Sequence, residues 1–137
     1  MITIRLKHSD YEVIVAHARG SLPNEACGLI AGKIDNDIKT VEKIYPLPNP
    51  DNSPEHYSID PKEQLAAVKD MRVNGISPLG NFHSHPSTPA RPSEEDIRLA
   101  YDPKASYLIL SLADETPELK AFGVSGSEVT PQALEIF

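Results

Sequence analysis

The chain has 137 residues, of which 39% are hydrophobic and 24% charged, and its formal net charge at pH 7 is -7. This length suits one domain with a buried core, and the composition is that of an ordinary globular protein, which excludes a disordered chain. The acidic balance argues against general binding to nucleic acid, because such binding depends on clustered Lys and Arg that displace counterions from phosphates. We therefore expect a single domain over residues 1–137, with no nucleic acid among its partners.

The N-terminal segment and the short apolar runs favour a cytoplasmic protein. The first ten residues, MITIRLKHSD, alternate in polarity and lack the apolar stretch of a secretory signal. No segment approaches the roughly 20 apolar residues of a membrane span. Cys27 is the single cysteine, which excludes an intramolecular disulfide and every CxxC-type metal or redox site. A metal site in this chain must therefore be built from His and carboxylate side chains.

The first elements are predicted to be a strand and a helix. Apolar residues alternate over residues 2–6, a pattern typical of a half-buried strand. Ser9, followed by Glu12 three positions later, has the form of a capping box, so a helix is predicted from there to about Arg19.

A β-hairpin and a proline-rich loop are predicted next. Residues 26–32 are small or apolar throughout, residues 41–47 alternate, and the Asp-Asn-Asp sequence at 35–37 suits the turn between them. Four prolines accompany Asn and Asp in residues 46–54, which indicates a surface loop, and residues 56–59 are predicted to form a short strand.

A second helix is predicted between Asp60 and Asn74. Asp60 can cap its start, Pro61 suits the first helical position, and Asn74-Gly75 is a suitable stop.

The remaining chain is predicted to be mostly strand. Residues 79–85 form a strand that runs into a loop over 86–92, after which Ser93 opens a third helix that ends near Tyr101. Further strands are predicted over residues 107–112, 119–124 and 128–136. Helices and strands mixed in this order predict the α/β class, a sheet layered with helices.

Candidate metal ligands gather where the 79–85 strand meets the third helix. His83 and His85 are two positions apart in a strand, so both imidazoles should point to the same face. A catalytic zinc ion takes three ligands from His and carboxylate side chains and leaves one position for water. Asp96, in the first turn of the third helix, is the best candidate for the third ligand.

Simpler explanations exist for each of these residues taken alone. A single HxH pair is more often a pair of surface residues than a ligand pair. Ser93 and Asp96 also fit a plain helix cap, which needs no catalysis. Glu25, just before a predicted strand, would by itself be a surface acid.

Together, the motifs resemble a known family. His83-Ser84-His85-Pro86, with seven residues between His85 and Ser93 and then Asp96, is similar to the HxHx7Sx2D signature of the JAMM metallopeptidases, also called MPN-plus domains. Upstream, residues 25–32 (EACGLIAG) resemble the glutamate strand of that family. The resemblance covers most of the chain and implies a three-layer α/β/α, cytidine-deaminase-like fold with a mixed sheet. The HxE and PCxxC ligands of the deaminases are absent, which disfavours deamination.

The resemblance also implies a role for each matching residue. His83, His85 and Asp96 would bind Zn²⁺, which makes its water more acidic and polarises a carbonyl. Glu25 would act as the base on that water and pass the proton to the leaving amine. Ser93 would hydrogen-bond the carbonyl oxygen as negative charge develops on it.

A ubiquitin-like partner follows from the same resemblance, since JAMM enzymes cut peptide or isopeptide bonds after the C-terminal glycine of such proteins. Only residues 102–105 separate the third helix from the next strand, which leaves little room for the insertions that grip ubiquitin in eukaryotic deubiquitinases. We therefore expect a ubiquitin-like sulfur-carrier protein with a Gly-Gly tail, from which the enzyme releases cysteine or trims residues. The alternatives are a catalytically silent MPN-type binding module and a DNA-repair-associated relative.

Neighbouring residues admit two interpretations. Cys27 should face the same side as Glu25, near the metal, but a small inert buried thiol is the favoured interpretation. His56 and Tyr57 could line a substrate groove, although packing against the second helix is favoured. The sequence predicts no oligomeric state.

Overall fold

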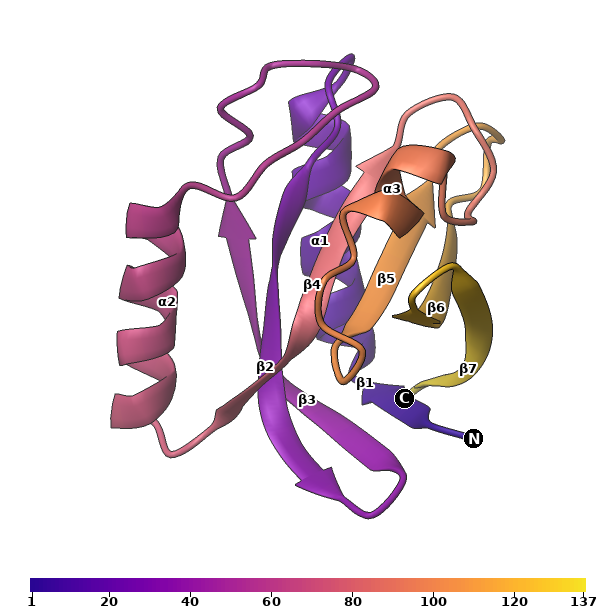
Figure 1. The fold of residues 1–137 in the computed structure, drawn as a ribbon. Helices are drawn as coiled ribbons and strands as arrows, with labels where there is room; N and C mark the ends of the chain where they lie inside the picture. The colour runs from indigo at the N-terminus through magenta and orange to yellow at the C-terminus, as the bar shows by residue number, and fades with distance from the viewer.

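The computed structural model describes all residues 1–137, and Figure 1 shows its three helices and seven strands. The helices are α1 (His8–Ser21), α2 (Pro61–Val73) and α3 (Glu94–Arg98). The strands are β1 (Thr3–Leu6), β2 (Cys27–Asp35), β3 (Ile38–Leu47), β4 (Ser77–His85), β5 (Ser106–Ser111), β6 (Glu118–Ser125) and β7 (Glu128–Ile136). None of the helices combines the length and the apolar character that crossing a membrane requires.

The strands form one mixed sheet that closes on itself. Their order is β1-β3-β2-β4-β5-β6-β7, and β1 pairs in parallel with both β3 and β7. The β4–β5 pair is also parallel, and the remaining pairs are antiparallel. Because β1 and β7 are neighbours, the two ends of the chain lie close together (Figure 1).

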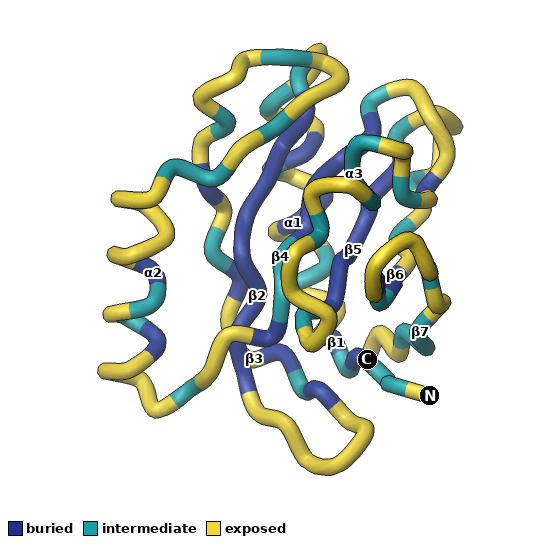
Figure 2. Tube along the Cα trace, in the orientation of Figure 1, coloured by how far each residue is buried: buried dark blue, intermediate teal, exposed yellow.

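Helices cover the two faces of the central strands. Residues of β2 alternate between these faces. Ile30 packs in the larger core with Ile14 of α1, whereas Leu29 packs in a second core with Met71 of α2. The buried strands thus lie between two partly exposed helical layers (Figure 2), which confirms the predicted three-layer α/β/α arrangement and the mixed sheet.

Local signals set the ends of α2 and the β2–β3 turn. The Asp60 carboxylate accepts a hydrogen bond of 2.8 Å from the Lys62 N–H, and Pro61 occupies the first turn. Gly75 follows the helix with φ = 67°, a conformation that a side chain disfavours. Asn36 turns the β2–β3 hairpin with φ = 53°, as its short polar side chain permits. Both elements are confirmed as predicted.

The predicted capping box at the start of α1 is wrong. The helix begins at His8, its N-cap is Lys7, and no side chain caps it. The N–H groups of Asp10 and Tyr11 donate to the Lys7 carbonyl, so the next residue, Ser9, is already inside the first turn. Only Lys7 separates β1 from α1, so the first turn of the helix forms before Ser9 can act as its N-cap.

Two further boundaries also differ from the prediction. Residues 56–59 form no strand, because their backbone bonds to a side chain: Asn49 Nδ2 donates to the His56 carbonyl at 2.9 Å. Helix α3 ends at Arg98 rather than near Tyr101. The chain beyond it is drawn toward the sheet, where Lys39 Nζ donates to the Lys104 carbonyl at 2.7 Å.

Candidate metal centre

The C-terminal end of β4 presents two buried histidines to the α2 side of the sheet. His83 and His85 are 1% and 4% exposed and share one face of the strand. The proline-containing loop after β4 turns back over His85, whose Nδ1–H donates to the Pro89 carbonyl at 2.8 Å. With this hydrogen bond made, the Nε2 atom of His85 carries the free lone pair.

Asp96 completes a triangle of possible ligand atoms. His83 Nε2, His85 Nε2 and Asp96 Oδ2 are each 3.1 Å from the other two. Tetrahedral zinc with bonds of about 2.0 Å would set its ligand atoms about 3.3 Å apart. The donor set and its spacing therefore fit a metal ion.

The charge states of His83 and Asp96 also suit metal binding. Burial lowers the pKa of His83 and favours its neutral form. Burial opposes ionisation of Asp96, but its contacts with His83 and His85 outweigh that effect and hold its pKa well below the usual range. Neutral imidazole and ionised carboxylate are the forms that coordinate metals.

A capping box holds Asp96 in place. Ser93 Oγ accepts from the Asp96 N–H at 3.0 Å, and the Ser93 N–H donates to Asp96 Oδ2 at 2.9 Å. The Ser93 hydroxyl donates to no group in the chain, so its proton is free for another acceptor. The two interpretations of this pair, helix cap and site residue, are therefore compatible.

Glu25 reaches the same place from the start of β2. Ala26 N–H donates to Ser84 Oγ at 2.8 Å, and Ser84 N–H donates to the Ala26 carbonyl at 3.0 Å. Cys27 pairs with His83 in the antiparallel register of β2 and β4. Continuing that register by two residues places Glu25 beside His85, on the same face as the histidines.

The Glu25 carboxyl group is unusual for an acid. Its side chain is buried, and Oε1 has no hydrogen-bond partner. Burial raises its pKa to about 7, an effect that His85 partly opposes. A carboxyl group that titrates near neutrality can both accept and release a proton at physiological pH.

Tyr57 adds an aromatic ring to the site. Its ring stacks on that of His83, with centroids 4.5 Å apart and planes at 21°. Burial raises the pKa of Tyr57, which keeps the phenol neutral. Tyr57 also packs against the core that contains Ala67 and Met71 of α2, which confirms the favoured interpretation. The contact with His83 was not predicted, because nothing in the local sequence pattern reveals it.

The other neighbouring residues have structural contacts. Cys27 is fully buried, with Sγ near the carbonyls of Pro48 (3.6 Å) and Ser58 (3.7 Å), and burial raises its pKa to about 12. This agrees with the inert-thiol interpretation. His56 Nδ1 lies 2.8 Å from a Glu95 carboxylate oxygen, and this contact raises the His56 pKa. The pair joins the proline-rich loop to α3.

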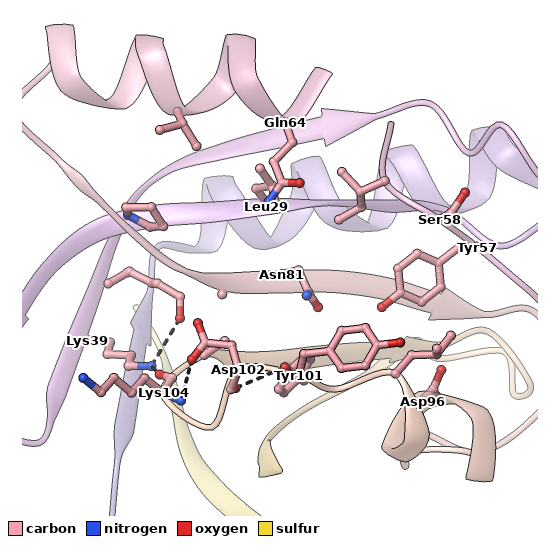
Figure 3. Close-up of a pocket in the computed structure, with 18 of the residues that line it drawn as sticks. Leu29, Lys39, Tyr57, Ser58, Gln64, Asn81, Asp96, Tyr101, Asp102 and Lys104 are labelled. Atoms are coloured by element: carbon pink, nitrogen blue, oxygen red, sulfur yellow. Dashed lines mark hydrogen bonds between the residues drawn. The ribbon is translucent and has the colours of Figure 1, made fainter. Parts of the chain in front are cut away.

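A groove of about 730 Å³ leads to the triangle (Figure 3). One side is α2, the other is the segment 99–105, and β4 forms the floor. Tyr57 and Asp96 lie at one end, and Lys39 and Lys104 at the other. The groove could guide an extended chain toward the triangle.

Comparison with known proteins identifies similar sequences. A family model described as prokaryotic homologs of the JAB domain matches residues 7–124. The CysO-cysteine peptidase of Mycobacterium tuberculosis is 36% identical over 124 residues, which cover 90% of this chain and 84% of that protein. The desampylase of Haloferax volcanii is 36% identical over 103 residues, covering 72% and 73% of the two chains.

A solved structure is also similar. The solution structure of a protein from Desulfitobacterium hafniense superposes with a TM-score of 0.92 at 56% sequence identity, and the match covers 98% of this chain and 92% of that one. The fold described above is therefore shared over nearly the full length of both chains.

Proposed function

Because the chain belongs to the prokaryotic JAB family of JAMM-type peptidases, and is thus a hydrolase, we propose that it is a zinc-dependent enzyme that cuts after the C-terminal glycine of a ubiquitin-like sulfur-carrier protein. The observation that carries this proposal is the equal 3.1 Å spacing of the His83, His85 and Asp96 ligand atoms. Three protein ligands leave the fourth position of zinc open, as in catalytic sites.

The bound zinc would make a water acidic and polarise the scissile carbonyl. Glu25 takes the proton of the attacking water and passes it to the leaving amine, a role that its buried, unpartnered oxygen and raised pKa support. Ser93 donates its free hydroxyl proton to the carbonyl oxygen as negative charge develops there. The Pro89 carbonyl holds the ring of His85 in its coordinating orientation.

The names of the relatives and the shape of the groove support a carrier tail as substrate. The mycobacterial relative is named for cleaving a CysO-cysteine adduct, and the archaeal one is a desampylase. The groove of about 730 Å³ that ends at Tyr57 and Asp96 has room for an extended chain segment.

We also propose that residues 1–137 act as one catalytic domain in the cytoplasm. The family model covers most of the chain, and the strands at its two ends, β1 and β7, pair with each other. The free Cys27 thiol is compatible with a reducing compartment.

The test is release of cysteine from a carrier whose C-terminal glycine is joined to it through an amide bond. We expect the wild-type protein to release cysteine and leave the carrier ending in glycine, as measured by intact-protein mass spectrometry. The matched control is Glu25→Gln, which keeps the side chain's shape and the metal ligands but removes the base. It should turn over about 10²- to 10⁴-fold more slowly with unchanged zinc content.

Two results would contradict the proposal. Equal turnover by wild type and Glu25→Gln would remove the assigned base. A zinc-loaded protein that binds such carriers without cleaving any of them would instead be a binding module of the MPN type.

A further inference from the structure

Asn81 is a polar residue on the floor of the groove. It lies on β4 two residues before His83, so both side chains face the same side. In the sheet it pairs with Leu29 of β2 and Tyr107 of β5, and all three residues line the groove. Figure 3 shows the Asn81 amide pointing from β4 into the groove.

The side-chain amide of Asn81 has no partner in the chain. Its Oδ1 is buried without a hydrogen bond, and its Nδ2 donates to no protein acceptor. The hydroxyl of Tyr107, its neighbour on β5, already donates to the Asp102 carbonyl at 3.2 Å. An unpaired buried polar group is destabilising, so its presence calls for a ligand that pairs with it.

The position of Asn81 indicates which part of a ligand it would meet. Two strand residues span about 6.6 Å, so Asn81 lies about that far along the groove from His83. An extended peptide with its scissile carbonyl at the triangle would place the residue about two positions earlier beside Asn81. Leu29 and Tyr107 flank this point with apolar surface, so the amide is the local hydrogen-bonding group.

From this geometry we infer that Asn81 is a specificity-determining residue, whose unpartnered Oδ1 accepts a backbone N–H of the substrate tail about two residues before the scissile bond. The inference rests on the proposed function, and it adds a residue outside the HxHx7Sx2D motif. A hydrogen bond to the substrate backbone recognises an extended tail without contacting a substrate side chain, which suits a substrate that ends in glycine. The carboxamide can turn about its last bond to present Oδ1 to the tail.

The test is the affinity of the cleaved carrier, ending in Gly-Gly, for wild-type, Asn81→Ala and Asn81→Leu proteins, measured by calorimetry. One neutral hydrogen bond is worth about 0.5–1.5 kcal/mol, so both variants should bind about two- to tenfold more weakly. Their zinc content should be unchanged. Their thermal midpoints should match or exceed that of the wild type, because no internal hydrogen bond is lost.

The matched control is Gln132→Ala. Gln132 on β7 also carries a buried amide oxygen without a partner, but it does not line the groove. Its replacement should leave carrier affinity unchanged. A tail peptide N-methylated at the contacted residue, which lacks the backbone N–H donor, should bind more weakly than the unmodified tail to wild type and equally to Asn81→Leu.

The possible results separate the two claims. Carrier binding by wild type with equal affinity in Asn81→Leu overturns the role of Asn81 and leaves the proposed function standing. A lowered thermal midpoint of Asn81→Leu with unchanged affinity assigns Asn81 to folding instead. No carrier binding by the wild-type protein overturns the proposed function and this inference together.

Discussion

Glu25 is 5% exposed, yet no group in the chain donates a hydrogen bond to its Oε1. Ionised carboxylates in such surroundings lose hydration without compensation, which is why burial raises the pKa of Glu25 to about 7 from its ordinary value of 4.5. A nearby cation would favour the charged form. The residue is thus costly to the metal-free fold and suited to a site that holds a positive ion.

This cost predicts a pH-dependent stability difference in the metal-free protein. Between pH 4.5 and about 7 the folded state holds the Glu25 proton more tightly than the unfolded state, so stability falls as pH rises through that window. The Glu25→Gln variant lacks this titrating group and therefore does not lose stability in this way. Its free energy of unfolding relative to wild type should rise between pH 5 and pH 8 by up to about 3 kcal/mol.

Urea unfolding in the presence of a chelator, at both pH values, measures this difference. Parallel pH dependence in the two proteins would contradict the burial argument.

The sequence placed Glu25 in the site by resemblance, but its burial depends on remote residues: Ser53 accepts from its N–H, and Asn49 donates to its carbonyl.

Among the elements, β2 and β4 are joined at the site by backbone pairing and by one side chain. Ser84, between the two histidines, accepts the Ala26 N–H and so fixes the segment that carries Glu25. Without that hydroxyl, the buried Ala26 N–H has no partner. Ser84 is therefore a positioning residue, acting through Glu25 rather than on substrate.

Ser84→Ala should cost about 1–3 kcal/mol of stability and lower kcat with little change in KM or zinc content. Ser84→Thr, which keeps the hydroxyl, should restore much of kcat. Steady-state kinetics at a temperature where both variants are folded is the measurement. A loss that appears in KM alone, or no rescue by Thr, would show that Ser84 does not act through Glu25.

Elements with complete local signals were predictable from the sequence. Helix α2 has its cap, its proline and its stop within 15 residues (60–74), and the β2–β3 hairpin has its turn residues at the right place. The start of α1 was not predictable, because it depends on the single residue that connects β1 to α1. The coil at 56–59 was not predictable either, because it depends on a hydrogen bond from the side chain of Asn49.

The site shows the same division. The positions of the candidate ligands follow from motif spacing, and that of Glu25 follows from the resemblance to the JAMM family. The parts missed, the ring of Tyr57 on His83 and the His56–Glu95 pair, join residues that are distant in sequence and have no motif. Only the folded chain brings them together.

At the scale of the whole molecule, closure of the sheet by β1 and β7 fixes the central strands, and three separate segments meet at the candidate metal centre. They are the start of β2, the end of β4 and the first turn of α3. A metal ion bound there would link β4 to α3 directly. Since an ion that binds only the folded state stabilises it, metal loading and stability should be coupled.

The central claim is that His83, His85 and Asp96 hold zinc, and the metal content of the purified protein tests it most directly. Elemental analysis after dialysis should find about one zinc per chain in the wild type and in Glu25→Gln, since one three-residue site is proposed. Both His83→Ala and His85→Ala should lose most of it. A folded wild-type protein that takes up no zinc, or variants that keep it without these histidines, would contradict the account.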